Sequence, residues 1–205
     1  MTKLNKIAVI LAHPDDAEIW IGGTILNHVN SGDKITVFYL FTESESRRKE
    51  AISLSNIANI NVMFPKTKDT LRHHLKKVNP NIIITHWERD SHIEHRMTYD
   101  IVSSLIPKLI LEDNIKFNLY LCDTYNSIGQ NNEVFIPNTY IDISNTWVRK
   151  TKIIMNHRSQ PTNYWIHMIH NQNKLYGLRN NVDLAEAFIQ INTLGFVYNN
   201  NKFLK

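Results

Sequence analysis

The stretch KIAVILAHPDDAEIWIGGTILNHVN, residues 6–30, decides the fold. Residues 6–12 are almost all apolar, as in a strand that is buried on both faces. A helix is predicted over residues 17–30. Residues 13–18, which connect the strand to this helix and include its first residues, hold one histidine and three carboxylates. The small residues of IGG (21–23) are expected to let this helix pack close to the sheet. A strand that enters a helix through a short polar turn is typical of the first half of a βαβ unit.

The same alternation continues along the chain. Further strands are predicted at residues 34–41, 61–64, 81–86 and 117–125. Helices are predicted at residues 45–58, 68–78 and 93–112, the last with a kink at Pro107. This order predicts a Rossmann-like α/β fold, with a mainly parallel sheet, helices on both faces and a site at the carboxyl ends of the strands.

The pattern loosens after about residue 126. A short strand at YIDIS (140–144) and helices over 145–157 and 162–178 are predicted, and residues 186–194 fit either a helix or a strand. The 205 residues, 42% of them hydrophobic, suffice for one compact core. We therefore expect a single domain over residues 1–205, in which about 126–205 form a cap or extension around the same site.

Composition narrows the range of partners. The net charge is +4 with a pI of about 9.1, but Lys and Arg are spread along the chain, so we expect no nucleic-acid partner. The single Cys122 excludes an internal disulfide and favours a reducing, cytoplasmic location. The apolar runs are too short for a signal-peptide core or a membrane span, so no membrane insertion is expected. A homo-oligomer is left open.

A second polar cluster, THWERDSHIEHR (85–96), follows the strand predicted at 81–86. Because the carboxyl ends of parallel strands lie at one edge of the sheet, this cluster and the first are expected to meet there. Within it His92 and His95 are three residues apart at the start of a helix, so both imidazoles can lie on one face. The two clusters together predict a ligand site.

The chemistry of the combined clusters indicates a metal ion. Taken alone, Asp15 and Asp16 have a simpler interpretation, because aspartates cap helices. Catalytic zinc, however, is held by imidazoles and a carboxylate that leave one coordination position open for water or substrate. Crowded carboxylates also repel one another unless a cation neutralises them. We expect a divalent metal, with zinc first and ferrous iron as the alternative.

These residues resemble the PIG-L/LmbE-like N-acetylglucosaminyl deacetylases, whose first strand ends in His-Pro-Asp-Asp and whose fourth ends in a His-x-Asp-His type sequence. The segments RRKEA (47–51), HRSQ (157–160) and AEAF (185–188) are similar to family segments too. The resemblance implies a metal-dependent hydrolase that removes the N-acetyl group from an N-acetylglucosamine-type amino sugar or its conjugate and releases acetate. The partner it implies is this small-molecule substrate.

The resemblance also implies roles for individual residues. His13, Asp16 and His95 match the metal ligands. Asp15 matches the general base, which takes a proton from water whose pKa the cation lowers. His92 matches the residue that faces the substrate carbonyl, where it stabilises the oxyanion or protonates the leaving amine.

Three further residues are candidates for substrate binding. Arg47 matches an arginine of the family, although a solvated basic helix start is an equal alternative. Asp69 is a candidate partner for a sugar hydroxyl, and His157 either reaches the site or has a capping or structural role. One departure is Glu94, which stands where relatives usually carry Asp and is one methylene longer.

Two other functions remain open from the sequence. One is a metal-dependent amidase that acts on a non-sugar N-acyl amine, and the other is a catalytically silent sugar-binding protein on the same fold. Asp15 and His92 argue against the silent protein, because a binding module needs neither a base nor an oxyanion donor. The histidines expected to have only structural roles are His28, His73, His74, His86, His167 and His170.

Overall fold

Seven strands form one sheet in the computed structural model, which describes residues 4–42 and 44–195. Their order across the sheet is β3-β2-β1-β4-β5-β7-β6. The first five strands run parallel, while β7 is antiparallel to both β5 and β6. The bounds are β1 Lys6–Leu11, β2 Lys34–Tyr39, β3 Asn61–Met63, β4 Ile82–His86, β5 Asn118–Cys122, β6 Thr139–Asp142 and β7 Ala185–Ile191. The mainly parallel sheet predicted from the sequence is confirmed.

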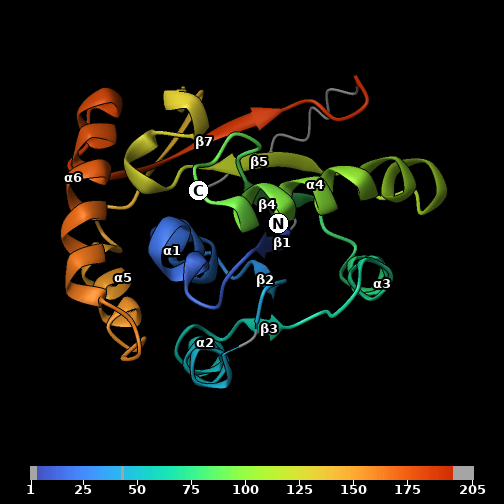
Figure 1. The fold of residues 1–205 in the computed structure, drawn as a ribbon, viewed down its shortest axis with the longest axis horizontal. Helices are drawn as coiled ribbons and strands as arrows, with labels where there is room; N and C mark the ends of the chain where they lie inside the picture. The colour runs from blue at the N-terminus through green and yellow to red at the C-terminus, as the bar shows by residue number, and fades with distance from the viewer. Residues whose placement is uncertain (1–3, 43, 196–205) are drawn as a thin grey trace.

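Helices cover both faces of the sheet, as Figure 1 shows. The helices are α1 Asp16–Asn30, α2 Glu45–Ala58, α3 Lys68–Val78, α4 Ile93–Pro107, α5 Trp147–Ile154 and α6 Thr162–Asn180. Two short 3-10 turns, Tyr125–Ser127 and Gln130–Asn132, follow β5. Among the helices of the described ranges, none combines the length and the apolar character that crossing a bilayer needs.

The two faces of the sheet carry separate apolar cores. Ile7, Val9 and Leu11 of β1 lie in one core with residues of α1, α2, α5 and α6. Ala8 and Ile10 point to the opposite face and lie in a second core with residues of α3 and α4. This alternation follows from the strand geometry, in which successive side chains point to opposite faces. A strand buried on both faces must therefore be apolar throughout, as residues 6–12 are.

The structure refines two of the predicted segments. The helix predicted over 93–112 changes type at Pro107: α4 ends there, and a π-helical turn, Lys108–Glu112, continues the chain. Proline has no N–H to continue the regular bonding pattern, which explains the change of helix type. Residues 186–194 fit two states in sequence, and Ala185–Ile191 is a strand because it pairs with β5 and β6. Part of the chain beyond residue 126 thus joins the main sheet.

The helix α1 is kinked and locked to the C-terminal part of the chain. Its backbone leaves helical geometry at Ile21 (φ −133°), and the freed N–H groups of Gly23 and Thr24 each donate to the buried Glu186 carboxylate at 2.8 Å. The buried Lys150 ammonium lies 2.8 Å from the same carboxylate. The ion pair neutralises a charge that would be costly to bury alone. It also fixes the helix that carries the first polar cluster.

The sheet topology brings the two polar clusters together. Strand order reverses between β1 and its neighbour β4, and ligands of open α/β sheets bind at such a switch point. Residues 13–16 leave β1 and residues 87–95 leave β4 at this same edge. The expected meeting point of the two clusters is therefore confirmed.

Candidate active site

The turn between β1 and α1 is held by its own backbone. The amides of Asp15 and Asp16 both donate to the carbonyl of His13, at 2.8 and 3.1 Å, and the His13 amide donates to Asp16 Oδ2 at 2.7 Å. Asp15 occupies the N-cap position of α1, but its side chain makes no capping hydrogen bond. The simple capping interpretation of the Asp pair therefore fails for Asp15.

The structure brings together the three residues predicted to hold a metal. Asp16 Oδ2 lies 3.3 Å from His13 Nδ1, and Asp16 Oδ1 lies 3.5 Å from His95 Nε2. Asp16 is buried and also accepts a hydrogen bond from the Trp20 indole at 3.0 Å. Burial opposes its ionisation, but the charge of the neighbouring His95 and the closeness of His13 and His86 hold the pKa of Asp16 well below its usual range.

The two ring nitrogens of His95, a predicted metal ligand, have different surroundings. Its Nδ1 donates to Asp90 Oδ2 at 3.0 Å, and its buried Nε2 has no hydrogen-bond partner within the described ranges. A carboxylate behind a histidine is a common way to orient a metal ligand. Burial opposes protonation of His95, yet Asp16 and Asp90 raise its pKa to about 10. Positive charge, from a proton or from a cation, is therefore favoured between His95 and Asp16.

His86 belongs to the site, although the sequence suggests only a structural role. It is fully buried, and its ring stacks on His95 with centroids 3.7 Å apart. Its Nε2 lies 3.2 Å from Asp16 Oδ2. Two sets of residues, which share His95, are close enough to hold an ion: one consists of Asp16, His86 and His95, and the other of His13, His92 and His95. The Ala12 amide donates to His86 Nε2 at 3.0 Å, so this lone pair is already engaged. Burial lowers the pKa of His86 to about 4, which keeps the ring neutral.

Asp15 combines burial with one strong partner. The Arg47 guanidinium donates to Asp15 Oδ2 at 2.6 Å. Burial and the charge of Asp16 raise the pKa of Asp15 to about 6, against the opposing effect of Arg47. A carboxylate poised near neutral pH suits a general base. Arg47, predicted as a substrate-binding residue, thus contacts the predicted base and also lines the cleft described next.

A cleft of about 410 Å³ opens in front of these residues. Tyr125, Gln160 and Trp165 reach it from the chain beyond residue 106. Gln160 ends the HRSQ segment noted in the sequence, whereas no motif indicated Tyr125 or Trp165. The lining residues are His13, Pro14, Phe41, Ser44, Arg47, His92, Glu94, Tyr125, Gln160 and Trp165. The volume and the mixture of aromatic and polar groups are typical of small-molecule sites.

His92 faces the cleft as a neutral imidazole. It caps α4, and its Nδ1 accepts the Glu94 amide hydrogen at 3.2 Å, so the neutral ring carries its proton on Nε2. Burial and the nearby His95 and His13 lower the pKa of His92. The ring therefore offers an N–H donor at the cleft.

The remaining two predicted substrate residues do not line the cleft. Asp69 is exposed in the first turn of α3, where an acidic side chain suits the helix dipole. His157 is buried, and its Nε2 lies 2.9 Å from Glu18 Oε1. Glu18 also accepts a hydrogen bond from the Tyr39 hydroxyl at 2.8 Å. His157 therefore lies next to the first polar cluster, but its partner there is Glu18 and it does not line the cleft.

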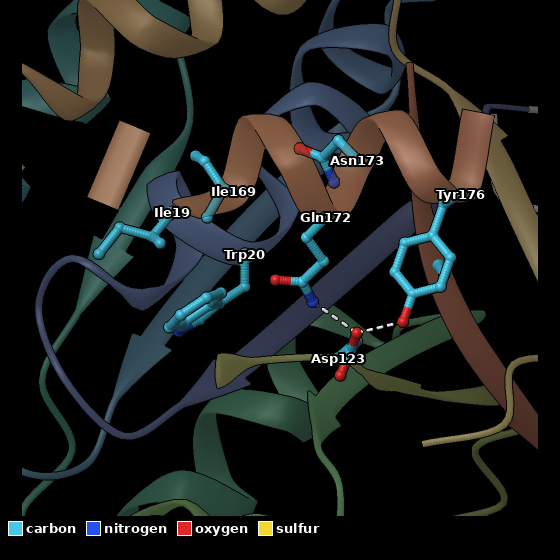
Figure 2. A pocket seen from close by; sticks show the side chains of 8 residues that line it. Ile19, Trp20, Asp123, Ile169, Gln172, Asn173 and Tyr176 are labelled. Atoms are coloured by element: carbon cyan, nitrogen blue, oxygen red, sulfur yellow. Dashed lines mark hydrogen bonds between the residues drawn. The ribbon is translucent and has the colours of Figure 1, made fainter. Parts of the chain in front are cut away.

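A second cavity, of about 10 Å³, lies between α1 and α6 and has room for about one water molecule. In Figure 2, Gln172 and Tyr176 of α6 converge on the Asp123 carboxylate. Ser127 donates to the same Asp123 oxygen at 2.6 Å. Burial raises the pKa of Asp123 to about 6, although these hydrogen bonds oppose the shift. The cavity is too small for an organic substrate, and Asp123 ties α6 to the end of β5.

Comparisons with known proteins agree with this architecture. The family model of the GlcNAc-PI de-N-acetylases (PIG-L) matches residues 8–106, which contain both polar clusters. No curated protein matches the chain by sequence.

Solved structures share the fold at low sequence identity. The hydratase GalB of Pseudomonas putida, which acts on 4-carboxy-2-hydroxymuconate, is 18% identical, with a TM-score of 0.75 over 94% of this chain and 98% of its own. A conserved protein of Thermus thermophilus is 19% identical, with a TM-score of 0.76 over 95% and 98%. The N,N'-diacetylchitobiose deacetylase of Pyrococcus horikoshii is 20% identical, with a TM-score of 0.72 over 91% and 84%. At such identities the likeness establishes the fold alone.

Proposed function

We propose that this chain, which belongs to the PIG-L family whose model matches residues 8–106, is a metal-dependent N-deacetylase. It would hydrolyse the acetamide of an N-acetylglucosamine-type sugar or conjugate, giving a free amine and acetate. The observation that carries the proposal is His95, whose buried Nε2 faces Asp16 while Asp90 holds the opposite nitrogen. This arrangement suits a metal ligand, because Nε2 makes no hydrogen bond within the described residues and lies 3.5 Å from an Asp16 oxygen that could share a cation with it.

His13, Asp16 and His95 would hold the ion. Two imidazoles and one carboxylate suit zinc, and ferrous iron is the alternative. When bound, a divalent cation supplies Lewis acidity: it polarises the acetyl carbonyl and lowers the pKa of water. His86 would support the site from behind, because its stacked neutral ring fixes the plane of His95.

Asp15 would move the protons of the reaction. In its ionised form it accepts a proton as water attacks the acetyl carbon, and Arg47 holds its carboxylate in place. The same proton can then pass to the amine nitrogen as the C–N bond breaks. Water thus supplies the hydroxyl of the acetic acid and the hydrogen of the amine, and Asp15 returns to its ionised form.

His92 would stabilise the developing oxyanion. Its Nε2–H can donate a hydrogen bond to the carbonyl oxygen as negative charge builds up there. Because the Glu94 amide engages Nδ1, a second proton on the ring would break an existing hydrogen bond. The geometry therefore favours the oxyanion role over protonation of the leaving amine, which we assign to Asp15.

The aromatic lining of the cleft supports a sugar substrate. Phe41, Tyr125 and Trp165 present apolar surfaces against which the C–H face of a pyranose can pack. The fold itself does not select the reaction, since a hydratase shares it. The choice of amide hydrolysis rests on the site and on the family. We also propose a cytoplasmic location, on the ground of the single Cys122.

The test is acetate release from two sets of compounds by zinc-loaded protein. One set contains N-acetylglucosamine and its conjugates, and the other contains simple N-acyl amines. Release from the sugars alone is expected. Release from the simple N-acyl amines alone would show that the protein is an amidase for non-sugar substrates and would overturn the proposed sugar substrate. No release from either set by protein with bound metal would favour the silent sugar-binding alternative.

A further inference from the structure

Glu94 contacts one of the predicted metal ligands. It lies in the first turn of α4 and its side chain is 37% exposed, yet its Oε2 lies 2.6 Å from Nε2 of His13. His92, which is much closer in sequence, receives only the backbone amide of Glu94. The carboxylate thus reaches across from the β4 side of the site to the residue that follows β1.

The two nitrogens of His13 face different partners. Nδ1 lies 3.3 Å from Asp16 Oδ2, while Nε2 lies against Glu94. The lone pairs of the two ring nitrogens diverge, so one ion can be bound by only one of them. With the proton on Nε2, the ring donates a charge-assisted hydrogen bond to Glu94 and turns its Nδ1 lone pair toward Asp16. With the proton on Nδ1, the Nε2 lone pair would face a carboxylate oxygen at 2.6 Å, which is repulsive.

The same logic holds for His95 with the two nitrogens exchanged. There Asp90 accepts from Nδ1 at 3.0 Å, and Nε2 faces Asp16. Each histidine thus has its own carboxylate on the outer nitrogen. The inner nitrogens, Nδ1 of His13 and Nε2 of His95, lie next to different oxygens of Asp16.

We propose that Glu94 is a positioning residue, which fixes the tautomer of His13 so that Nδ1 is the metal-binding atom. The inference rests on the metal site of the proposed function. Carboxylates behind metal-binding histidines orient the ring and raise its basicity. Glu94 would orient the His13 ring in this way. Because Glu94 also lines the cleft, the same side chain would face the substrate.

The first test is zinc affinity, measured by competition with a chelator. Glu94→Ala removes the acceptor, and a loss of about 10- to 100-fold in affinity is expected. Glu94→Gln keeps an acceptor oxygen of the same reach and is expected to lose less. Glu112→Gln is the matched control, since it removes one carboxylate that pairs with Arg72 instead of the site, and its zinc affinity should equal that of the wild type.

The second test reads the tautomer directly. In zinc-loaded protein labelled with ¹⁵N-histidine, NMR should place the His13 proton on Nε2. A proton on Nδ1, or unchanged zinc affinity in Glu94→Ala, would overturn the inference while leaving the metal site intact. A wild-type chain that binds neither zinc nor ferrous iron would overturn both proposals. Unfolding of the metal-free Ala and Gln variants in urea separates a loss of affinity from a loss of folding.

Discussion

Each carboxylate of the first cluster finds its own partner once the chain is folded. Asp15 binds Arg47, and Glu18 accepts from the buried His157. Asp16 lies between the histidines proposed to hold the metal. The three negative charges within residues 13–18 are thus separated into a proposed base, a proposed metal ligand and a buried hydrogen-bond acceptor, and the proposed metal ligand is the one that faces the site for a cation.

Asp15→Asn is expected to separate catalysis from metal binding. The amide keeps the shape of the side chain but cannot take a proton from water, so kcat should fall by about 10²- to 10⁴-fold. The zinc content, measured on the same sample by elemental analysis, should match that of the wild type. Turnover at the wild-type rate by the zinc-loaded variant would show that Asp15 is not the base.

The two histidines of HIEH are expected to behave differently. His92→Ala should retain zinc and lose about 10²- to 10³-fold in kcat, the usual effect of removing an oxyanion donor. His95→Ala should lose zinc itself, because it removes the ring whose Nε2 faces Asp16. Equal zinc content in the two variants would contradict the assignment of roles.

The two polar motifs predicted that His13, Asp15, Asp16, His92 and His95 lie near one another, because each motif follows a strand of the parallel sheet. The structure places both motifs at the same edge of the sheet. The motifs did not indicate Asp90 or His86, because the contacts of these residues with His95 form only in the folded chain. Asp90 accepts a hydrogen bond from His95 Nδ1, and the His86 ring stacks on the His95 ring. Arg47 and His157 were tied to substrate, but the partners they contact are acidic residues of the first cluster. Such pairings are decided by packing between elements distant in sequence.

Close packing of α1 accounts for its glycine pair. A Cβ at Gly23 would lie 2.5 Å from Ile143 Cγ2, whereas a Cβ at Gly22 would meet Lys150 Cγ at 3.2 Å. The sequence predicts close packing of the IGG segment against the sheet. In the structure Gly23 lies against Ile143, which directly follows β6, whereas Gly22 lies against α5.

Gly23→Ala is expected to destabilise the protein by about 1–3 kcal/mol, since the added methyl must displace Ile143. Gly22→Ala is the matched control on the same helix. Its contact is with a flexible stem, and the gain in helix propensity offsets part of the cost. Urea unfolding of both variants measures the difference, and equal stabilities would contradict the packing account.

The Asp123 contact between β5 and α6 predicts a pH dependence of stability. Burial raises the pKa of Asp123 from 3.8 to about 6, so between these values the folded chain binds a proton that the unfolded chain releases. Its contribution to stability is therefore full below about pH 4 and is lost as the pH rises through about 6.

Asp123→Asn removes this titration. The unfolding free energy of the wild type minus that of Asp123→Asn should increase when the pH is lowered from about 7.5 to about 5. Urea unfolding of both proteins at the two pH values gives the comparison. A difference that stays constant would show that Asp123 has the same pKa in both states, and one that decreases would show that folding lowers this pKa. Either result would contradict the account.

Element boundaries were predictable where the pattern was long. The strands and helices up to residue 112 follow the predicted order because apolar strands and amphipathic helices alternate strictly there. Ala185–Ile191 was ambiguous because its seven residues fit both periods, and only pairing with β5 and β6 makes it a strand. Short segments whose state depends on distant partners cannot be decided from local pattern.

At the scale of the molecule, chemistry and specificity come from different parts of the chain. The family match and the reacting residues lie within residues 8–106. The later part of the chain contributes Tyr125, Gln160 and Trp165 to the cleft, and it carries no motif that names a substrate. The residues on which the proposed reaction rests were therefore readable from sequence, whereas no residue of the sequence identifies the substrate.

The central claim is that one metal ion, held by His13, Asp16 and His95, makes this chain an N-deacetylase. Its most direct test is a zinc titration of metal-free protein, in which acetate release from N-acetylglucosamine derivatives is measured at each step. We predict that release rises until one zinc is bound per chain and then levels off, and that His95→Ala stays at the background rate. Release that is as fast in the presence of a chelator as with zinc would contradict the claim.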